Sequence, residues 1–261
     1  MAQGFLTAQV RGHVTEVTMR NAAKHNSFSA AMSTELVDAL RDAQGAGSRA
    51  VILRAEPGVK VWSAGHDISE LPDGDQDPLA WTNTLAAMME DVAAFPLPLI
   101  AAVEGGVWGG ACELVMAADI VVAHEASTFA ITPAKLGVAY SSAGISRFLA
   151  ALPVHIAKEM FFTAEPISAQ RAYDFGVVNH LVADADELEL RCWQLADVIS
   201  QRAPLTIRSA KAEIQAMTLP GESVNESAQL RSLRDSAWTS EDYREGVRAF
   251  KERRAPVFGG K

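Results

Sequence analysis

The stretch Val103-Glu104-Gly105-Gly106-Val107-Trp108-Gly109-Gly110-Ala111-Cys112-Glu113-Leu114 decides the fold. The residues that lead into it, Pro98–Val103, form an apolar run that predicts a buried strand, and Ala111–Ala118 is apolar enough for a buried helix. Small residues at such a turn let the backbone approach a ligand closely. The first turn of a helix also presents unpaired N–H groups and the positive end of the helix dipole, which stabilise a developing oxyanion.

A second glycine-bearing segment, Trp62-Ser63-Ala64-Gly65-His66-Asp67-Ile68, lies earlier in the chain. Its Asp67 is expected to cap the following turn. Both segments are equally explained as ordinary turns when spacing alone is considered. The residues by themselves therefore leave a structural and a catalytic interpretation open.

The sequence lacks the common catalytic and nucleotide-binding motifs. It contains no G-x-S-x-G, no P-loop, no G-x-G-x-x-G and no H-E-x-x-H. Its six histidines are scattered, and none is paired with another at the spacing of metal ligands. We therefore expect neither a catalytic metal nor a bound nucleotide cofactor.

Composition and charge exclude several classes of protein. Of the 261 residues, 49% are hydrophobic and 21% charged, which is typical of a globular protein. The net charge of −9 opposes non-specific binding to nucleic acid or to an anionic membrane. The two cysteines cannot form a disulfide framework, and the most apolar long stretch, Val92–Val103, is too short to span a bilayer and contains two prolines. With no targeting segment evident, we expect a soluble cytoplasmic protein.

The first half of the chain alternates strand and helix patterns, which is typical of an α/β core. Ser29–Ala43 is the clearest helix, with Ser29 as its cap and an apolar face formed by Met32, Leu36, Val37 and Leu40. The segment Ala55–Asp77 is rich in Gly, Pro and Asp and is predicted to be a loop, and Pro78–Ala94 is predicted to be a helix with Trp81 facing inward. Further strands are predicted over Val14–Met19, Ala50–Leu53, Ile120–Ala123 and Ser127–Ile131.

The last third has a different pattern. Ala185–Ala249 shows helical periodicity almost without strands, Pro204 is typical of a helix start, and Leu219-Pro220-Gly221 indicates a break between helices. The sequence thus predicts a strand-bearing core over residues 1–200 and a helical region over residues 201–261.

Taken together, the two glycine segments resemble the crotonase (enoyl-CoA hydratase/isomerase) superfamily. Asn26 fits the N-terminal motif of that family, and Ala118-Asp119-Ile120 fits the segment after the buried helix. The similarity spans nearly the whole chain, because further motifs of the family match Phe129–Gly137, Ala169-Gln170-Arg171-Ala172, Gly176-Val177-Val178-Asn179 and Phe250–Phe258.

The resemblance implies a spiral core of repeated ββα turns with a C-terminal helical trimerisation region, assembled as trimers or hexamers. It implies an acyl-CoA thioester substrate and no cofactor beyond that coenzyme A. The backbone N–H groups of His66 and Gly110 would form an oxyanion hole for the thioester enolate. By family position, the residues that would bind substrate or coenzyme A are Lys24, Ala64, Asp67, Ile68, Thr132, Lys251, Arg253 and Arg254, the last three in the chain itself or across a subunit contact.

The choice of reaction depends on two positions. The resemblance implies that a hydratase of this family uses two Glu residues to activate water. The first of these maps onto Glu113, but Pro133 occupies the position of the second. Proline has no titratable group, so it can be neither an acid nor a base. Decarboxylation of a malonyl-type thioester needs the oxyanion hole but no base, because loss of CO₂ leaves the enolate directly.

Within the family, the stretches around Gly65, Gly110 and Pro133, with Leu136-Gly137-Val138-x-Tyr140, resemble bacterial decarboxylases that convert methylmalonyl-CoA into propionyl-CoA. The resemblance implies that His66 supplies its N–H to the oxyanion hole and that Tyr140 orients the substrate carboxylate. The sequence departs from this subgroup at Ala139 and at Ser141-Ser142-Ala143.

Two other functions are considered. One is an enoyl-CoA hydratase or isomerase that acts through Glu113, against which Pro133 counts. The other is a family member that only binds acyl-CoA or RNA; the net charge of −9 counts against RNA.

Overall fold

The strands of the chain form two sheets. The structure is a computed structural model, which describes residues 4–71, 83–218 and 227–261. The larger sheet has the order β1-β2-β3-β5-β7-β10 and the smaller one the order β4-β6-β8-β9. The strands of the larger sheet are β1 (Leu6–Arg11), β2 (Val14–Met19), β3 (Ala50–Ala55), β5 (Leu99–Val103), β7 (Ile120–His124) and β10 (His180–Val182). Those of the smaller sheet are β4 (Val61–Ser63), β6 (Gly106–Trp108), β8 (Thr128–Ala130) and β9 (Ile167–Ser168).

Consecutive strand pairs alternate between the two sheets. In β3–β4, β5–β6 and β7–β8, the first strand joins the larger sheet and the second joins the smaller one. The chain then enters a helix before the next pair begins. Pairing is parallel between successive turns, as in the register Ile100↔Ile120 of β5 and β7. This repetition is a spiral of ββα turns, which confirms the predicted fold class.

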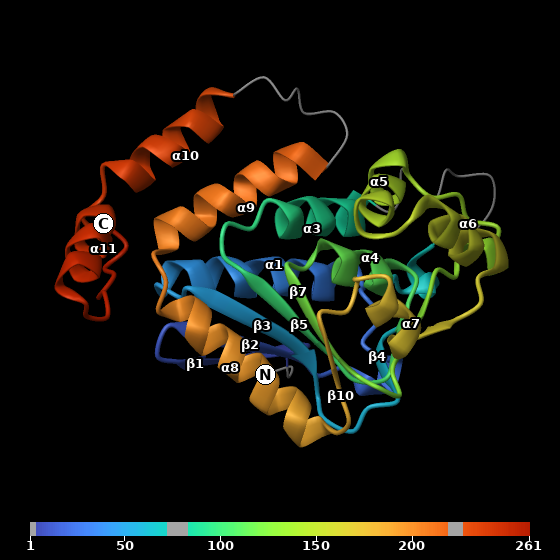
Figure 1. The fold of residues 1–261 in the computed structure, drawn as a ribbon. Helices are drawn as coiled ribbons and strands as arrows, with labels where there is room; N and C mark the ends of the chain where they lie inside the picture. The colour runs from blue at the N-terminus through green and yellow to red at the C-terminus, as the bar shows by residue number, and fades with distance from the viewer. Residues whose placement is uncertain (1–3, 72–82, 219–226) are drawn as a thin grey trace.

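The helices surround the two sheets (Figure 1). Their bounds are α1 (Ala30–Gly45), α3 (Asn83–Ala93), α4 (Gly110–Ala117), α5 (Ser142–Ala151), α6 (Val154–Thr163), α7 (Ala169–Asp174), α8 (Ala185–Ser200), α9 (Pro204–Thr218), α10 (Ala228–Trp238) and α11 (Glu241–Glu252). Short 3₁₀ turns are η1 (Ala22–Lys24), η2 (Ile68–Glu70) and η3 (Pro133–Lys135).

The central strands of the larger sheet, β3 and β5, are buried on both faces, because α8 covers one face and α1, α3 and α4 lie on the other (Figure 1). Alternate side chains of β3 point to the two sides: Ile52 packs in the cluster that contains Trp193 of α8, and Leu53 packs in the cluster that contains Leu36 of α1. A strand covered on both sides is a continuous apolar run, which explains why β3 and β5 are evident in the sequence.

Several local predictions are confirmed. Ser29 caps α1 by accepting a hydrogen bond from the N–H of Met32, and the predicted apolar face of that helix is buried. Pro204 opens α9. In α3, Met88 and Met89 are buried, whereas Trp81 and the predicted break at residues 219–221 lie outside the described residues.

The prediction of a loop over Ala55–Asp77 is wrong at Val61–Ser63, and residues 72–77 of that range lie outside the described residues. Val61–Ser63 forms strand β4, which pairs with β6, and Ile68–Glu70 forms η2. A fully buried strand of three residues shows no alternation of polar and apolar residues, so the local sequence gives no signal that a strand forms there. Strand β6 is equally short and lies within the glycine segment, so the sequence did not indicate it either.

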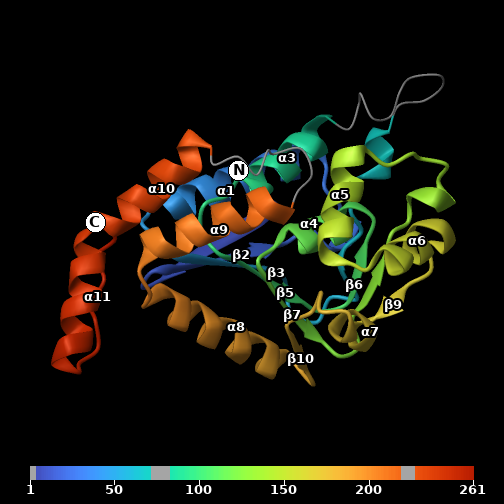
Figure 2. The same cartoon turned by 45° about the horizontal axis from the view of Figure 1, so that its top comes forward.

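Within the described residues, every element after residue 200 is a helix. Helix α10 packs against α9. Helix α11 follows α10 and lies at the side of the molecule opposite α5 and α6 in both views (Figures 1 and 2). A buried ion pair anchors α9 to the core: Nζ of Lys211 lies 2.7 Å from Oδ2 of Asp119, just before β7, and 2.9 Å from the carbonyl oxygen of Leu97. The division into a core and a trimerisation domain stays a prediction.

Among the described residues, no helix combines the length and apolar character needed to cross a lipid bilayer.

Candidate active site

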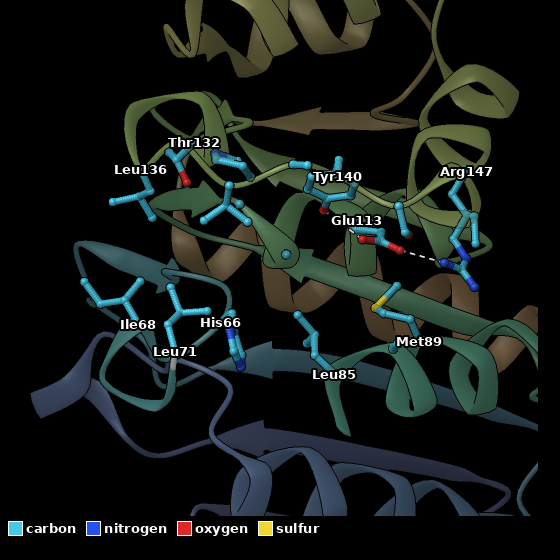
Figure 3. A pocket seen from close by; sticks show the side chains of 18 of the residues that line it. His66, Ile68, Leu71, Leu85, Met89, Glu113, Thr132, Leu136, Tyr140 and Arg147 are labelled. Carbon is cyan, nitrogen blue, oxygen red and sulfur yellow. Dashed lines mark hydrogen bonds and ion pairs between the residues drawn. The ribbon is translucent and has the colours of Figure 1, made fainter. Parts of the chain in front are cut away.

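A cavity of about 190 Å³ lies where α3, α4 and α5 meet the loops after β4 and β8 (Figure 3). Its wall is mostly apolar, with a few polar groups gathered at α4 and α5. The residues that line it include Ala64, His66, Ile68, Leu71, Leu85, Met89, Gly110, Glu113, Thr132, Pro133, Leu136, Val138, Ala139, Tyr140 and Arg147. The two glycine segments singled out in the sequence therefore meet at one cavity.

Gly65 permits this meeting. It has a φ of +82°, which side chains rarely adopt, and a β-carbon placed on it would lie 2.5 Å from the carbonyl oxygen of Trp108 and 2.6 Å from the backbone nitrogen of Gly110. Both distances are shorter than van der Waals contact. The absence of a side chain at Gly65 therefore brings the backbone of His66 against the first turn of α4.

The polar backbone at this contact suits an anion. Gly110 is the first residue of α4, so no carbonyl of that helix accepts its N–H. His66 and Gly110 both line the cavity. Burial lowers the pKa of His66 below its usual value, so its imidazole is neutral at pH 7 and adds no positive charge to the site.

Glu113, Tyr140 and Arg147 form a hydrogen-bonded cluster at one end of the cavity (Figure 3). The hydroxyl of Tyr140 donates to Oε2 of Glu113 at 2.7 Å, and Nη1 of Arg147 donates to Oε1 at 2.6 Å. Burial, and then the negative charge of Glu113, raise the pKa of Tyr140 well above its usual value. Tyr140 is therefore a neutral phenol across the physiological pH range, held edge-on against Phe148 and Phe161.

Asp67 lies between two lining residues, His66 and Ile68, but does not itself line the cavity. Its carboxylate caps η2, accepting hydrogen bonds from the N–H and the hydroxyl of Ser69 at 3.0 and 2.6 Å. These bonds lower its pKa, with a smaller contribution from Lys24, whose Nζ lies 3.6 Å away. The expected capping role of Asp67 is confirmed, and Lys24 is an exposed cation beside this carboxylate, which directly precedes Ile68 of the cavity lining.

Pro133 opens η3 and lines the cavity directly after Thr132. A β-carbon on Gly109 would lie 3.0 Å from Oγ1 of Thr132, so the loop after β8 also packs tightly on the α4 turn. The position at which the sequence suggested a missing carboxylate is thus part of the cavity wall.

The structure does not bring the C-terminal cations to this site within one chain. Lys251 belongs to α11, and Arg253 and Arg254 follow it, at the opposite side of the molecule from α5 (Figures 1 and 2). Arg254 is bound to Glu245 at 2.6 Å, and its hydrogen bonds hold the pKa of that carboxylate below the usual range.

Arg147 is the one polar member of this cluster that the sequence analysis missed. It lies on α5, 34 residues from Glu113, within a helix whose other residues are apolar apart from its serines. A single arginine on such a helix was the available signal. In the described part of the chain, no group of three or more potential ligands is arranged to hold a metal ion.

A family model described as enoyl-CoA hydratase/isomerase matches residues 9–261 of the chain. The chain belongs to the enoyl-CoA hydratase/isomerase family. The resemblance found in its motifs is thereby confirmed.

Relatives in this family include the methylmalonyl-CoA decarboxylase of Escherichia coli strain K12, which is 40% identical over the full length of both chains. A solved structure of methylmalonyl-CoA decarboxylase in complex with 2-nitronate-propionyl-CoA is 39% identical, covers both chains completely and has a TM-score of 0.80. The carnitinyl-CoA dehydratase of Salmonella typhi is 33% identical over 96% of each chain. The chain is thus similar over its full length to members of the decarboxylase subgroup that its motifs indicated.

Proposed function

We propose that this enoyl-CoA hydratase/isomerase family member is a carboxy-lyase that decarboxylates methylmalonyl-CoA, or a close malonyl-type thioester, to propionyl-CoA. The observation that carries the proposal is the pair of positions at which water chemistry would need carboxylates. Pro133 occupies one of them in the cavity wall, and Glu113 at the other is held by Arg147 and Tyr140. The full-length similarity to a methylmalonyl-CoA decarboxylase supports the same reaction.

In the proposed reaction, the bond between the α-carbon and the carboxylate breaks, and CO₂ leaves. The electron pair of that bond moves into the thioester and forms an enolate. The N–H groups of His66 and Gly110 stabilise its oxygen, aided by the positive end of the α4 dipole. A proton from water then adds to the α-carbon, so no side chain has to remove a proton from carbon.

The apolar part of the cavity favours the same step. Leu85, Met89 and Val138 contribute apolar side chains to the cavity lining. An ionised carboxylate is stabilised less by such a wall than by water, whereas neutral CO₂ loses little. Ala64, Ile68 and Thr132 would complete the walls around the acyl group.

Coenzyme A would be bound through its phosphates by cations. Lys24, which is exposed and pairs with Asp67, is one candidate. Lys251, Arg253 and Arg254 would act from a neighbouring subunit, because in their own chain they lie far from the cavity. Binding across a subunit contact requires self-association, which we propose to give trimers or hexamers. We further propose a cytoplasmic location and no cofactor beyond the coenzyme A of the substrate.

We assign Tyr140 the role of orienting the substrate carboxylate, which requires its hydroxyl proton to turn from Glu113 toward the substrate. Tyr140→Phe is expected to lower kcat by about 10-fold to 100-fold, the value of one hydrogen bond to a charged group. KM should change less than threefold. Steady-state decarboxylation kinetics, with exposed Tyr173→Phe as the control, provide the measurement. Full turnover by Tyr140→Phe would remove this residue from the mechanism.

The reaction itself is tested with two substrates. Purified protein is incubated with methylmalonyl-CoA and, separately, with crotonyl-CoA, and the thioesters are followed by mass spectrometry. We expect propionyl-CoA from the first and no hydration of the second. Hydration of crotonyl-CoA with methylmalonyl-CoA unchanged would overturn the proposal and would mean that Glu113 suffices for water chemistry.

A further inference from the structure

A second cavity, of about 530 Å³, lies farther along the same two helices. It is bounded by the C-terminal halves of α4 and α5 and by the apolar sides of α8 and α9. Met116, Ala150, Ala151, Ile207 and Ile214 make its surface largely apolar. Its volume exceeds that of the cavity at the glycine segments, yet none of the chemistry proposed above uses it.

Arg147 separates the two cavities. Among the described residues it alone lines both of them. Its side chain is 12% exposed, and its Nη1 is bound to Glu113. Its buried Nε has no hydrogen-bond partner in the described part of the chain. The guanidinium therefore lies between the two largely apolar cavities and is held by its ion pair with Glu113.

The order of residues along α4 fixes where this partition lies. Gly110 begins the helix at the oxyanion contact, Glu113 follows one turn later, and Met116 follows one turn after that. On α5, Arg147 is followed by Ala150 and Ala151 at the same helical spacing. An acyl group whose thioester oxygen sits at Gly110 thus reaches the Glu113–Arg147 pair first and the second cavity only beyond it. Figure 3 shows this pair at the side of the site away from Ile68 and Leu71.

We propose that Arg147, held by Glu113, is the end wall that restricts the site to short acyl groups, and that the apolar cavity behind it accepts longer alkyl chains once the wall is removed. This specificity-determining role rests on the proposed function, because it assumes an acyl-CoA bound with its thioester at Gly110. A charged wall also disfavours an alkyl chain in the native enzyme, since entry would break the buried ion pair between the guanidinium and the carboxylate.

The experiment compares alkylmalonyl-CoA substrates that carry methyl, ethyl and butyl groups. In Arg147→Ala, we expect the ratio of kcat/KM for butylmalonyl-CoA to that for methylmalonyl-CoA to rise at least about tenfold over the native enzyme, the scale of discrimination in an apolar pocket. Arg147→Lys is the matched control, because it keeps both a cation and a long side chain. Its ratio should stay within threefold of the native value.

Arg147→Ala leaves Glu113 buried without its cation, which endangers folding. The double variant Glu113→Gln/Arg147→Ala removes that charge and opens the same wall, and it should show the same rise. If both variants are folded and turn over methylmalonyl-CoA with an unchanged ratio, Arg147 is not the wall.

Binding separates this inference from the proposed reaction. Isothermal titration with propionyl-CoA and hexanoyl-CoA needs no chemistry. A relative gain of about tenfold for hexanoyl-CoA in the open variants supports the wall even when no malonyl thioester is decarboxylated. Equal relative affinities in the native and open proteins contradict it, as does failure of all these proteins to bind acyl-CoA.

Discussion

Replacing Gly65 with alanine is expected to lower kcat for decarboxylation by about 10²–10³-fold. A methyl group at this position would overlap the carbonyl of Trp108 and the backbone nitrogen of Gly110, so the two segments that carry the proposed oxyanion donors must move apart. Removing one such donor costs about 2.7–4 kcal/mol of transition-state stabilisation in other enzymes. Because the enolate forms only during the reaction, KM should change much less than kcat.

The matched control is Gly12→Ala. Gly12 also has a positive φ, of +60°, but a β-carbon there meets nothing within 4 Å, and the residue lies in the turn between β1 and β2. Strain from the positive φ is therefore common to both variants, whereas overlap at the oxyanion contact is confined to Gly65→Ala. Steady-state kinetics and urea denaturation of both proteins separate the two effects. A folded Gly65→Ala protein with turnover within threefold of native would show that the contact does not position the donors.

Lys211→Met is expected to lower the free energy of unfolding by about 3 kcal/mol. The lysine reaches from α9 to Asp119 and to the carbonyl of Leu97, and its side chain is 7% exposed. Breaking a buried ion pair from one side costs about 3–5 kcal/mol, since the remaining charge is left without compensation. We expect a value at the lower end of this range because the side chain of Asp119 is 26% exposed and still accepts a hydrogen bond from the N–H of Leu99.

Lys135→Met provides the comparison in equilibrium urea denaturation. Lys135 pairs with Glu165 on the surface, with exposed fractions of 53% and 71%. Surface pairs contribute about 0–1 kcal/mol, so this variant should be almost as stable as the native protein. The double variant Asp119→Asn/Lys211→Met should recover part of the loss. Equal stability of the two single variants would contradict an anchoring role for Lys211.

Much of the site could be predicted from the sequence because its chemistry is local. The glycines at 65, 109 and 110 mark places where the backbone turns with a positive φ or packs closely, and those requirements act on single residues. Of the twelve residues expected to act on the substrate, seven line the cavity: His66, Gly110, Glu113, Tyr140, Ala64, Ile68 and Thr132. The family motifs, not periodicity, indicated which of these belong together.

The cations at the C-terminus show the limit of this approach. Their family positions suggested coenzyme A binding, but within the chain Arg254 is engaged by Glu245 and the others lie far from the cavity. A position in a motif carries no information about whether the partner comes from the same chain. The predicted role of Lys251 and Arg253 across a subunit contact therefore stays a prediction.

By itself, the sequence determined the elements whose signals are short-range: the Ser29 cap and apolar face of α1, the apolar runs of β3 and β5, the glycine turn before α4 and the helical last third. Only the tertiary structure decided the pairing of β4 with β6 and the partnerships of Glu113 with Arg147 and of Asp119 with Lys211, which lie 34 and 92 residues apart. Periodicity and capping act over a few residues of one element. A buried ion pair or a short strand is stabilised by neighbours that only packing brings within reach, so its signal is absent until the chain has folded.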